Sequence, residues 1–315
     1  MRMVIGFRAS SIMYSWLVSN EIKGTVLLPA NICETVPAVY VKAGLKIKLC
    51  DIDKETYDIS EEIIRKKLSA EIKVLHFNHT YGRKNVEQDT LICKIKNEYP
   101  NILIVEDRCL CEPDLSVPKT VADIVIYSTG NTKVVNIGKG GFAYIGEKWN
   151  YIEQNEPFSD KADAEFDKHI KECHSNIRPV DWKIMKAEWI KFDLGMSQDE
   201  YMDELNKELP RSIKHKKIIN EIYSGLNGSL EDDYNIWRYQ LLLKNAIECK
   251  KALFENGLYC NNHFMSLGNG YFSDEETSNC NFLYNHILNL FNDFCYTEEQ
   301  AKKTVQILKK IMIPY

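Results

Sequence analysis

The sequence is poor in the features that mark several classes of protein. Its charges nearly balance, with 40 Lys and Arg against 45 Asp and Glu, so it offers no basic face for nucleic acid. No apolar run approaches the roughly 20 residues that a transmembrane helix needs. The chain also lacks a Gly-x-Gly-x-x-Gly or Gly-x-Ser-x-Gly motif, which argues against a dinucleotide-binding domain and an α/β-hydrolase.

The ten cysteines are too scattered for a disulfide scaffold, and none of them forms a Cys-x-x-Cys pair. Cys109 and Cys111 would point the same way on a strand, but no histidine motif lies nearby to complete a metal site. His169, Cys173 and His174 lie in a charged helical stretch that is typical of a solvent-exposed face. We therefore predict a cytoplasmic protein with reduced thiols and no metal.

The chain has enough apolar material for a large core, with 315 residues of which 44% are hydrophobic. One apolar segment, Ala9–Val18, follows Arg2 and Arg8 in the manner of a signal sequence. Its serines, and the lack of a small-residue cleavage site after it, favour a helix instead.

The first half of the chain alternates short apolar runs with helical patterns. The expected strands are Thr25–Pro29, Lys46–Cys50, Lys73–His79, Asn101–Val105, Ala122–Ser128 and Phe142–Ile145. Helices are expected at Glu61–Leu68, behind a cap in Asp58-Ile-Ser-Glu-Glu, and at Val86–Glu98. This alternation predicts an α/β fold with a mostly parallel sheet, in which ligands bind beyond the carboxyl ends of the strands.

The second half has a different pattern. It predicts a smaller α+β domain. The one expected strand is Trp237–Leu243. The expected helices are Asp181–Leu205, Pro210–Leu226, Ala246–Asn256 and Thr297–Met312. We place a large domain at residues 1–205 and a small C-terminal domain at 206–315.

The ends of two expected strands carry residues that together indicate one chemistry. The run Ile102–Asp107 ends in two acids, and Ser128 is followed by Lys133 and Gly140-Gly141. Singly, these features are typical of a helix cap, a solvated lysine and a turn. Together, they suit pyridoxal phosphate: a lysine in a dry pocket forms a Schiff base with its aldehyde, and a carboxylate keeps its ring nitrogen protonated. Hydroxyls and backbone N–H groups at a helix N-terminus would hold the phosphate.

These segments resemble the DegT/DnrJ/StrS family of fold-type I pyridoxal-phosphate proteins, which are mostly sugar aminotransferases. The resemblance runs in order along nearly the whole chain, and its most specific part is Ser128-Thr-Gly-Asn-Thr-Lys133 with Gly140-Gly141. The other matching segments of the first half are Leu28-Pro-Ala-Asn-Ile-Cys-Glu-Thr35, the stretch from Ala43 to Asp53, His79-Thr-Tyr-Gly82 and Val105-Glu-Asp107. Those of the second half are Leu194-Gly-Met-Ser-Gln-Asp-Glu200, Trp237-Arg238-Tyr239 and His286-Ile-Leu-Asn-Leu290.

The resemblance implies a role for each matching residue. Lys133 would form the Schiff base and shuttle the proton, and Asp107 would pair with the pyridine nitrogen. The other implied cofactor contacts are Ser128, Ser10 and Ser11 at the phosphate, Asn31 on the ring, and His79 near it. A turn histidine bonded to backbone explains His79 equally well. Arg238 would meet a substrate carboxylate, with a surface salt bridge as the alternative.

The resemblance also implies the partners and exposes some departures. It implies a homodimer that moves an amino group from glutamate to a nucleotide-linked ketosugar. The chain has fewer residues before the phosphate loop than the family usually has. Asn31, Leu110 and Asp193 stand where an aromatic, a Gln or His, and a phosphate-binding Asn are usual. The dehydratase branch replaces the lysine with histidine, so Lys133 favours amino transfer. A non-catalytic binding or partner subunit is the competing hypothesis.

Overall fold

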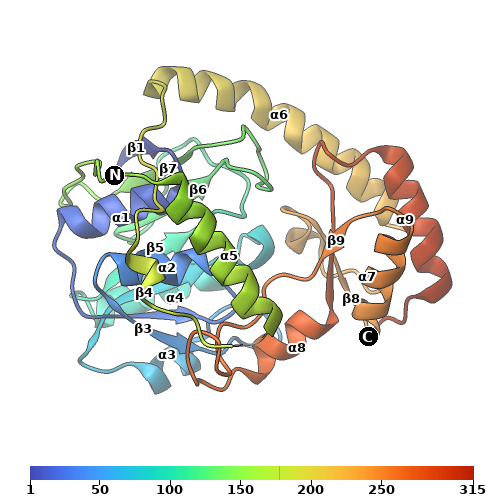
Figure 1. Ribbon diagram of the computed structural model, residues 1–315, viewed down its shortest axis with the longest axis horizontal. Helices are drawn as coiled ribbons and strands as arrows, with labels where there is room; N and C mark the ends of the chain where they lie inside the picture. The colour runs from blue at the N-terminus through green and yellow to red at the C-terminus, as the bar shows by residue number, and fades with distance from the viewer. Residues whose placement is uncertain (177) are drawn as a thin grey trace.

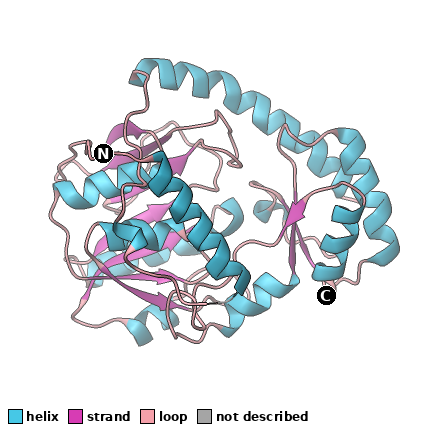
Figure 2. Cartoon of the chain, viewed as in Figure 1, coloured by secondary structure: helices cyan, strands magenta, loops and turns pink. Residues whose placement is uncertain are grey.

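The protein is described here by a computed structural model that covers residues 1–176 and 178–315. Within these residues the chain forms two lobes, one around a seven-stranded sheet and one around a three-stranded sheet (Figure 1). Figure 2 shows the strands of the large lobe as a twisted layer with helices on both sides. The predicted α/β architecture with a smaller α+β part is confirmed.

The sheet of the large lobe has the strand order β1-β7-β6-β5-β4-β2-β3. Its strands are β1 Arg2–Gly6, β2 Thr25–Pro29, β3 Lys46–Cys50, β4 Ile72–Asn78, β5 Leu103–Asp107, β6 Ile124–Ser128 and β7 Gly141–Ile145. β7 runs antiparallel to β1 and β6, and the pairs from β6 to β3 are parallel. The carboxyl ends of the parallel strands therefore meet along one edge of the sheet.

Helices cover both faces of this sheet because its strands are apolar on both sides. Val26 and Leu28 of β2 belong to one core, and Leu27 between them belongs to the core of the opposite face. The first face is covered by α1 Ala9–Ser19, α2 Thr35–Lys42 and α5 Asp160–Asn176, and the second by α3 Glu61–Lys67 and α4 Val86–Glu98. Ser60 caps α3, within the segment predicted to supply the cap.

The small lobe pairs its strands in the order β8-β10-β9, all antiparallel. Its elements are β8 Tyr239–Leu242, β9 Cys260–Asn261, β10 Ile287–Leu290, α7 Ala246–Glu255, α8 Ser278–His286 and α9 Glu298–Ile311. The sequence predicted a single strand here, so the prediction missed β9 and β10. β9 has only two residues, which are too few for a periodic signal, and β10 has four.

The long helix α6, Gln198–Tyr223, joins the lobes (Figure 1). It continues through Pro210, so the prediction of two helices separated at this proline was wrong. Pro210 is exposed, and the helix is anchored on both sides of it by Tyr201 and Leu205 in a core of the large lobe and by Ile219 and Tyr223 in the core of the small lobe. The proposed domain boundary at 205/206 falls inside this helix.

The helix predicted over Asp181–Leu205 is also wrong before residue 198. Residues 184–186 form a 3-10 turn, η2, and the chain after it is extended. Ile190, Phe192 and Leu194 are buried while the residues between them are exposed. This period of two is the signature of extended chain lying on a core. Among the described residues, no helix is long and apolar enough to cross a membrane.

Candidate active site

A cavity of about 350 Å³ lies at the carboxyl ends of β5 and β6. It is lined by five of the residues that the sequence singled out, namely Ser10, His79, Asp107, Ser128 and Lys133. They come from four segments that are far apart in the sequence and meet because parallel strands end at one edge. Phe264 closes the cavity from the side of the small lobe. The roles assigned to these residues stay predictions, but their predicted meeting point exists.

Asp107 is the last residue of β5 and offers a carboxylate to the cavity, with 14% of its side chain exposed. Its Oδ1 accepts a hydrogen bond from the backbone N–H of Cys109 at 2.8 Å. Burial alone would raise the pKa of Asp107, but His76 and the Cys109 N–H lower this pKa to about 2. The group is therefore an ionised acceptor over the whole physiological pH range.

A buried chain of polar groups stands behind Asp107. The Nε2 atom of His76 lies 3.4 Å from Oδ2 of Asp107, and Nδ1 of His76 lies 3.0 Å from the hydroxyl of Tyr40. Burial raises the pKa of Tyr40 well above its ordinary value, so its hydroxyl keeps its proton and donates to Nδ1. His76 then carries its proton on Nε2, the ring nitrogen nearer to the carboxylate. Sequence reasoning missed both residues, although His76 lies two residues before the end of β4.

Lys133 lies in the loop between β6 and β7, which turns sharply after Ser128. Gly141 is required where this loop ends, because a Cβ there would lie 2.8 Å from the backbone nitrogen of Ala9 and 2.8 Å from the carbonyl oxygen of Tyr127. Thr129 holds the base of the loop together. Its carbonyl accepts a hydrogen bond from the N–H of Ile137 across the loop, and its hydroxyl is hydrogen-bonded to the hydroxyl of Tyr201 of α6 at 2.8 Å. Among the described residues, no carboxylate lies within 4.0 Å of the Lys133 amine.

One end of the cavity suits an anion. Ser128 and Ser10 line it, and Ser10 lies in the first turn of α1, where backbone N–H groups point out of the helix. Ser11 lies next to Ser10 but does not line the cavity. Its buried hydroxyl donates to the carbonyl of Arg8 at 2.8 Å and accepts from the N–H of Arg8 at 3.2 Å, so it caps α1.

Two further predicted residues do not reach the cavity. Asn31 is buried at the end of β2 and donates through Nδ2 to the carbonyl of Tyr57 at 3.0 Å. Arg238 is 3% exposed and stacks between the rings of Trp237 and Phe291, at 4.3 and 3.8 Å. It is therefore a buried cation of the small lobe, and it forms no salt bridge with any of the described residues. Arg238 does not line the cavity, and the substrate contact assigned to it stays a prediction.

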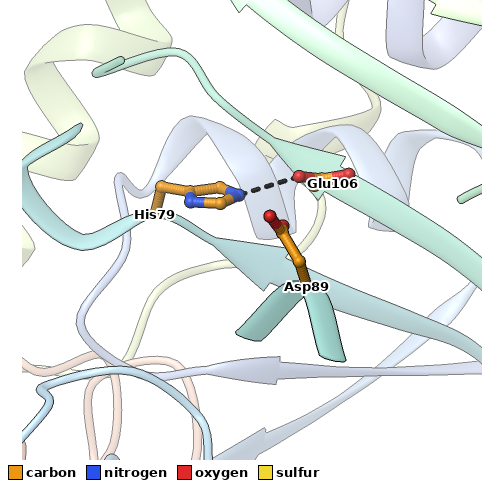
Figure 3. Close-up of side chains that lie close together, drawn as sticks. All are labelled: His79, Asp89 and Glu106. Atoms are coloured by element: carbon orange, nitrogen blue, oxygen red, sulfur yellow. Dashed lines mark hydrogen bonds and ion pairs between the residues drawn. The ribbon is translucent and has the colours of Figure 1, made fainter. Parts of the chain in front are cut away.

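His79 contributes to the cavity wall, but its ring is directed to Glu106 (Figure 3). Nε2 of His79 lies 2.9 Å from the carboxylate of Glu106, and Nδ1 lies 3.0 Å from the carbonyl oxygen of Arg83. Both partners are acceptors, so both ring nitrogens carry protons. Burial opposes this charge, but Glu106 raises the pKa of His79 above its ordinary value. The backbone bond of the alternative is present, and a contact of His79 with the cofactor stays a prediction.

Figure 3 also shows Asp89 close to this pair, and the three side chains have the residue types of a metal site. Arg108 fills the position that a cation would take. Its guanidinium pairs with Glu106 and lies 3.7 Å from Asp89, while Thr120 donates to the second oxygen of Glu106 at 3.3 Å. His79 and Arg108 lower the pKa of Glu106 against the effect of burial. The cluster is an internal ion network.

Besides Asn31, the sequence departs from the family pattern at Leu110 and Asp193, which lie in different places. Leu110 lines the cavity, so an apolar side chain faces the space where an amide or imidazole was expected. Asp193 is exposed and outside the cavity lining, where its Oδ1 accepts from the N–H of Gly195 at 2.8 Å. The turn at His79–Gly82 passes close to Leu110, since a Cβ on Gly82 would lie 2.0 Å from its carbonyl oxygen.

No protein-family model and no curated protein matches the sequence. Solved structures match along nearly the whole chain. The fold is fold type I. One match is the apo form of Spr1654 from Streptococcus pneumoniae, assigned as a sugar aminotransferase, with a TM-score of 0.70, 15% identity and coverage of 98% of this chain and 86% of that one.

Two other matches agree with this fold. One is GDP-4-keto-6-deoxy-D-mannose-3-dehydratase from E. coli with bound hydrated PLP, with a TM-score of 0.63, 17% identity and coverage of 98% and 87% of the two chains. The other is DesI in the presence of its TDP-sugar product, with a TM-score of 0.69, 14% identity and coverage of 98% and 80%. At such identities the likeness is one of fold, and the chemistry rests on the cavity.

Proposed function

We propose that the protein is a pyridoxal-phosphate-dependent aminotransferase in which Lys133 holds the cofactor. The observation that carries this proposal is the shared cavity of Lys133 and the ionised Asp107. A cationic ring nitrogen needs a buried carboxylate that stays charged, and a covalently held aldehyde needs an amine within reach. The fold type I scaffold supplies both from neighbouring strand ends.

The lining of the cavity fits this cofactor. Asp107 already accepts from Cys109 through Oδ1 and still has acceptor capacity for a ring N–H. Asn78 lines the cavity, and its buried Oδ1 has no hydrogen-bond donor among the described residues, which suits a ligand hydroxyl. Ser10, Ser128 and the first turn of α1 would receive the phosphate.

When bound, pyridoxal phosphate supplies an aldehyde that exchanges amines and a ring that accepts an electron pair. The chain supplies the rest. Lys133 would move a proton between the two carbons that exchange the amino group, because it lines the cavity and, among the described residues, no carboxylate lies within 4.0 Å of its amine. Ile126, Val36 and Phe264 give the cavity apolar walls that limit the access of water.

We propose a ketosugar, linked to a nucleotide, as the amino acceptor and glutamate as the donor. The matches with Spr1654 and with DesI and its TDP-sugar product support this choice of substrate class. The retained Lys133 favours amino transfer over the dehydration named for the E. coli match. We further propose a cytoplasmic homodimer. The ten cysteines lie within the described residues and are all free, as expected in a reducing compartment.

Binding through Lys133 is tested by spectroscopy and mass spectrometry. The purified protein is loaded with pyridoxal phosphate, its visible absorbance is recorded, and the adduct is reduced with borohydride and located in peptides. We expect a visible band and one pyridoxyl group on Lys133, and both should be lost in Lys133→Ala. Lys139→Ala, which changes a second lysine of the same loop, is the matched control and should keep both.

Amino transfer is then measured with glutamate and a panel of nucleotide-linked ketosugars, as glutamate-dependent conversion of the cofactor in single turnovers. A wild-type protein without the band, or with the label on another lysine, would contradict the proposal. A labelled Lys133 without turnover on any acceptor would favour the competing hypothesis of a non-catalytic partner subunit.

A further inference from the structure

The loop that carries Lys133 is tied at its base by the large lobe and at its tip by another part of the chain. The base ties are the bonds from Thr129 to Gly140 and from Gly140 to Phe7, at 3.1 and 2.7 Å. At the tip, the indole Nε1 of Trp237 donates to the carbonyl oxygen of Thr132 at 2.5 Å. Within the described chain, this is the one side-chain hydrogen bond made to residues 130–133.

The bond falls at a backbone position that needs support. Thr132 has φ of +65°, in the left-handed region that β-branched side chains rarely adopt. Thr132 is exposed, so packing does not impose this conformation. The carbonyl that Trp237 holds belongs to the peptide group between Thr132 and Lys133. Its direction therefore fixes where the Lys133 side chain leaves the backbone.

Trp237 is itself held from every side. It is 3% exposed, and its ring lies parallel to those of Tyr81 and Phe264, at centroid distances of 6.4 and 6.2 Å. We call these three rings the Trp237 stack. Its backbone N–H donates to the carbonyl of Tyr81 at 3.3 Å, and its carbonyl accepts from the buried amine of Lys216 at 2.7 Å. A side chain so fixed provides a rigid anchor for a loop.

We infer that Trp237 is a positioning residue, which holds the peptide before Lys133 so that the lysine amine reaches the cofactor. This inference rests on the proposed role of Lys133 and extends it to a residue outside the cavity lining. Trp237 leads directly into β8 of the small lobe, and its stacking partner Phe264 lines the cavity. The Trp237 stack thus forms part of the cavity wall through Phe264 and holds the loop that carries Lys133.

The substitution Trp237→Phe separates the hydrogen bond from the stack, because it keeps an aromatic ring and removes the indole N–H. In the cofactor-free protein, we expect the amides of residues 130–133 to exchange with deuterium roughly fivefold faster, since one hydrogen bond is lost. In the loaded protein, we expect less pyridoxyl label on Lys133 after borohydride reduction at limiting cofactor, and a shift in the pH midpoint of the visible band.

Trp189→Phe is a matched control. Trp189 is also 3% exposed, stacks on Phe166 at 4.4 Å and donates through Nε1 to the carbonyl of Met185 at 2.8 Å, but it lies outside the cavity lining. It should leave loop exchange and labelling at the wild-type level. Unchanged exchange of residues 130–133 in Trp237→Phe, or an equal change in both variants, would overturn the inference. The exchange measurement needs no cofactor, so it tests the inference separately from the proposed function. Failure of the proposed function would instead appear as wild-type protein in which Lys133 carries no label.

Discussion

Glu106 and Asp107 are neighbours at the end of β5, yet they lie in different surroundings. Glu106 has no exposed surface and is bonded by His79, Arg108 and Thr120. Asp107 faces the cavity and has bonding capacity left over. Successive residues of a strand point to opposite faces, so one strand end supplies both a closed ion network and an open acceptor. A buried acid beside a histidine therefore indicates a ligand site only where the carboxylate can still accept a further hydrogen bond.

The largest expected effects come from removing each charge in turn. Asp107→Asn should lower amino transfer by about 10³-fold, because the carboxylate acts on the cofactor. Glu106→Gln should cost about 3 kcal/mol of unfolding free energy, because it leaves the charges of His79 and Arg108 unbalanced. Single-turnover kinetics and denaturant unfolding on both variants check this comparison. Equal losses of amino transfer in the two variants, each measured on folded protein, would refute it.

A smaller effect is expected from the chain behind Asp107. His76→Phe removes the polar partner of the carboxylate, so the pKa of Asp107 should rise and amino transfer should fall about tenfold. His76→Gln, which keeps a donor, should recover part of this loss. NMR titration of Asp107 in the apo-protein measures the pKa directly. If both variants behaved like the wild type, the His76 contact would have no influence on the acid.

The smallest expected effect is a pH dependence of stability that arises in the buried ion network around Glu106. His79 has a raised pKa in the folded protein. Its contribution to stability is therefore fully present below the unfolded value of about 6.5 and is lost as pH rises through the folded pKa. The unfolding free energy of the wild type should fall over this window, and that fall should be missing in His79→Phe. Denaturant midpoints across pH 5–9 test it, with Asp107→Asn as the control that retains the fall.

The sequence carried enough information for most strands of the large lobe, although β1 was not predicted. Its buried strands are continuous apolar runs between turn residues, and Thr25–Pro29 and Lys46–Cys50 have the predicted bounds. The strand-end residues Asp107, Ser128 and Lys133 meet because the topology brings the ends of parallel strands together. Most of the cavity could thus be assembled from local patterns and one rule about sheets.

The parts that could not be predicted depend on contacts between distant segments. Nothing in the residues near Pro210 shows that cores of two lobes hold the helix on either side of it. The Trp237 anchor joins residues 105 positions apart in the sequence, so no local pattern records it. The burial of Asn31 and Arg238 is likewise decided by neighbours from other elements. Residue type alone identifies what a side chain can do, and packing decides whether it faces the cavity.

The course of α6 has a consequence for how the chain can be divided. Its first turns complete a core of the large lobe and its last turns complete the core of the small lobe. A fragment that ended at residue 205 would keep only the beginning of the helix, and the remaining fragment would begin inside it. Since short isolated helices are only marginally stable in water, neither fragment would keep its part of the helix folded. The two lobes have separate sheets, but each depends for its folding on the same uninterrupted helix.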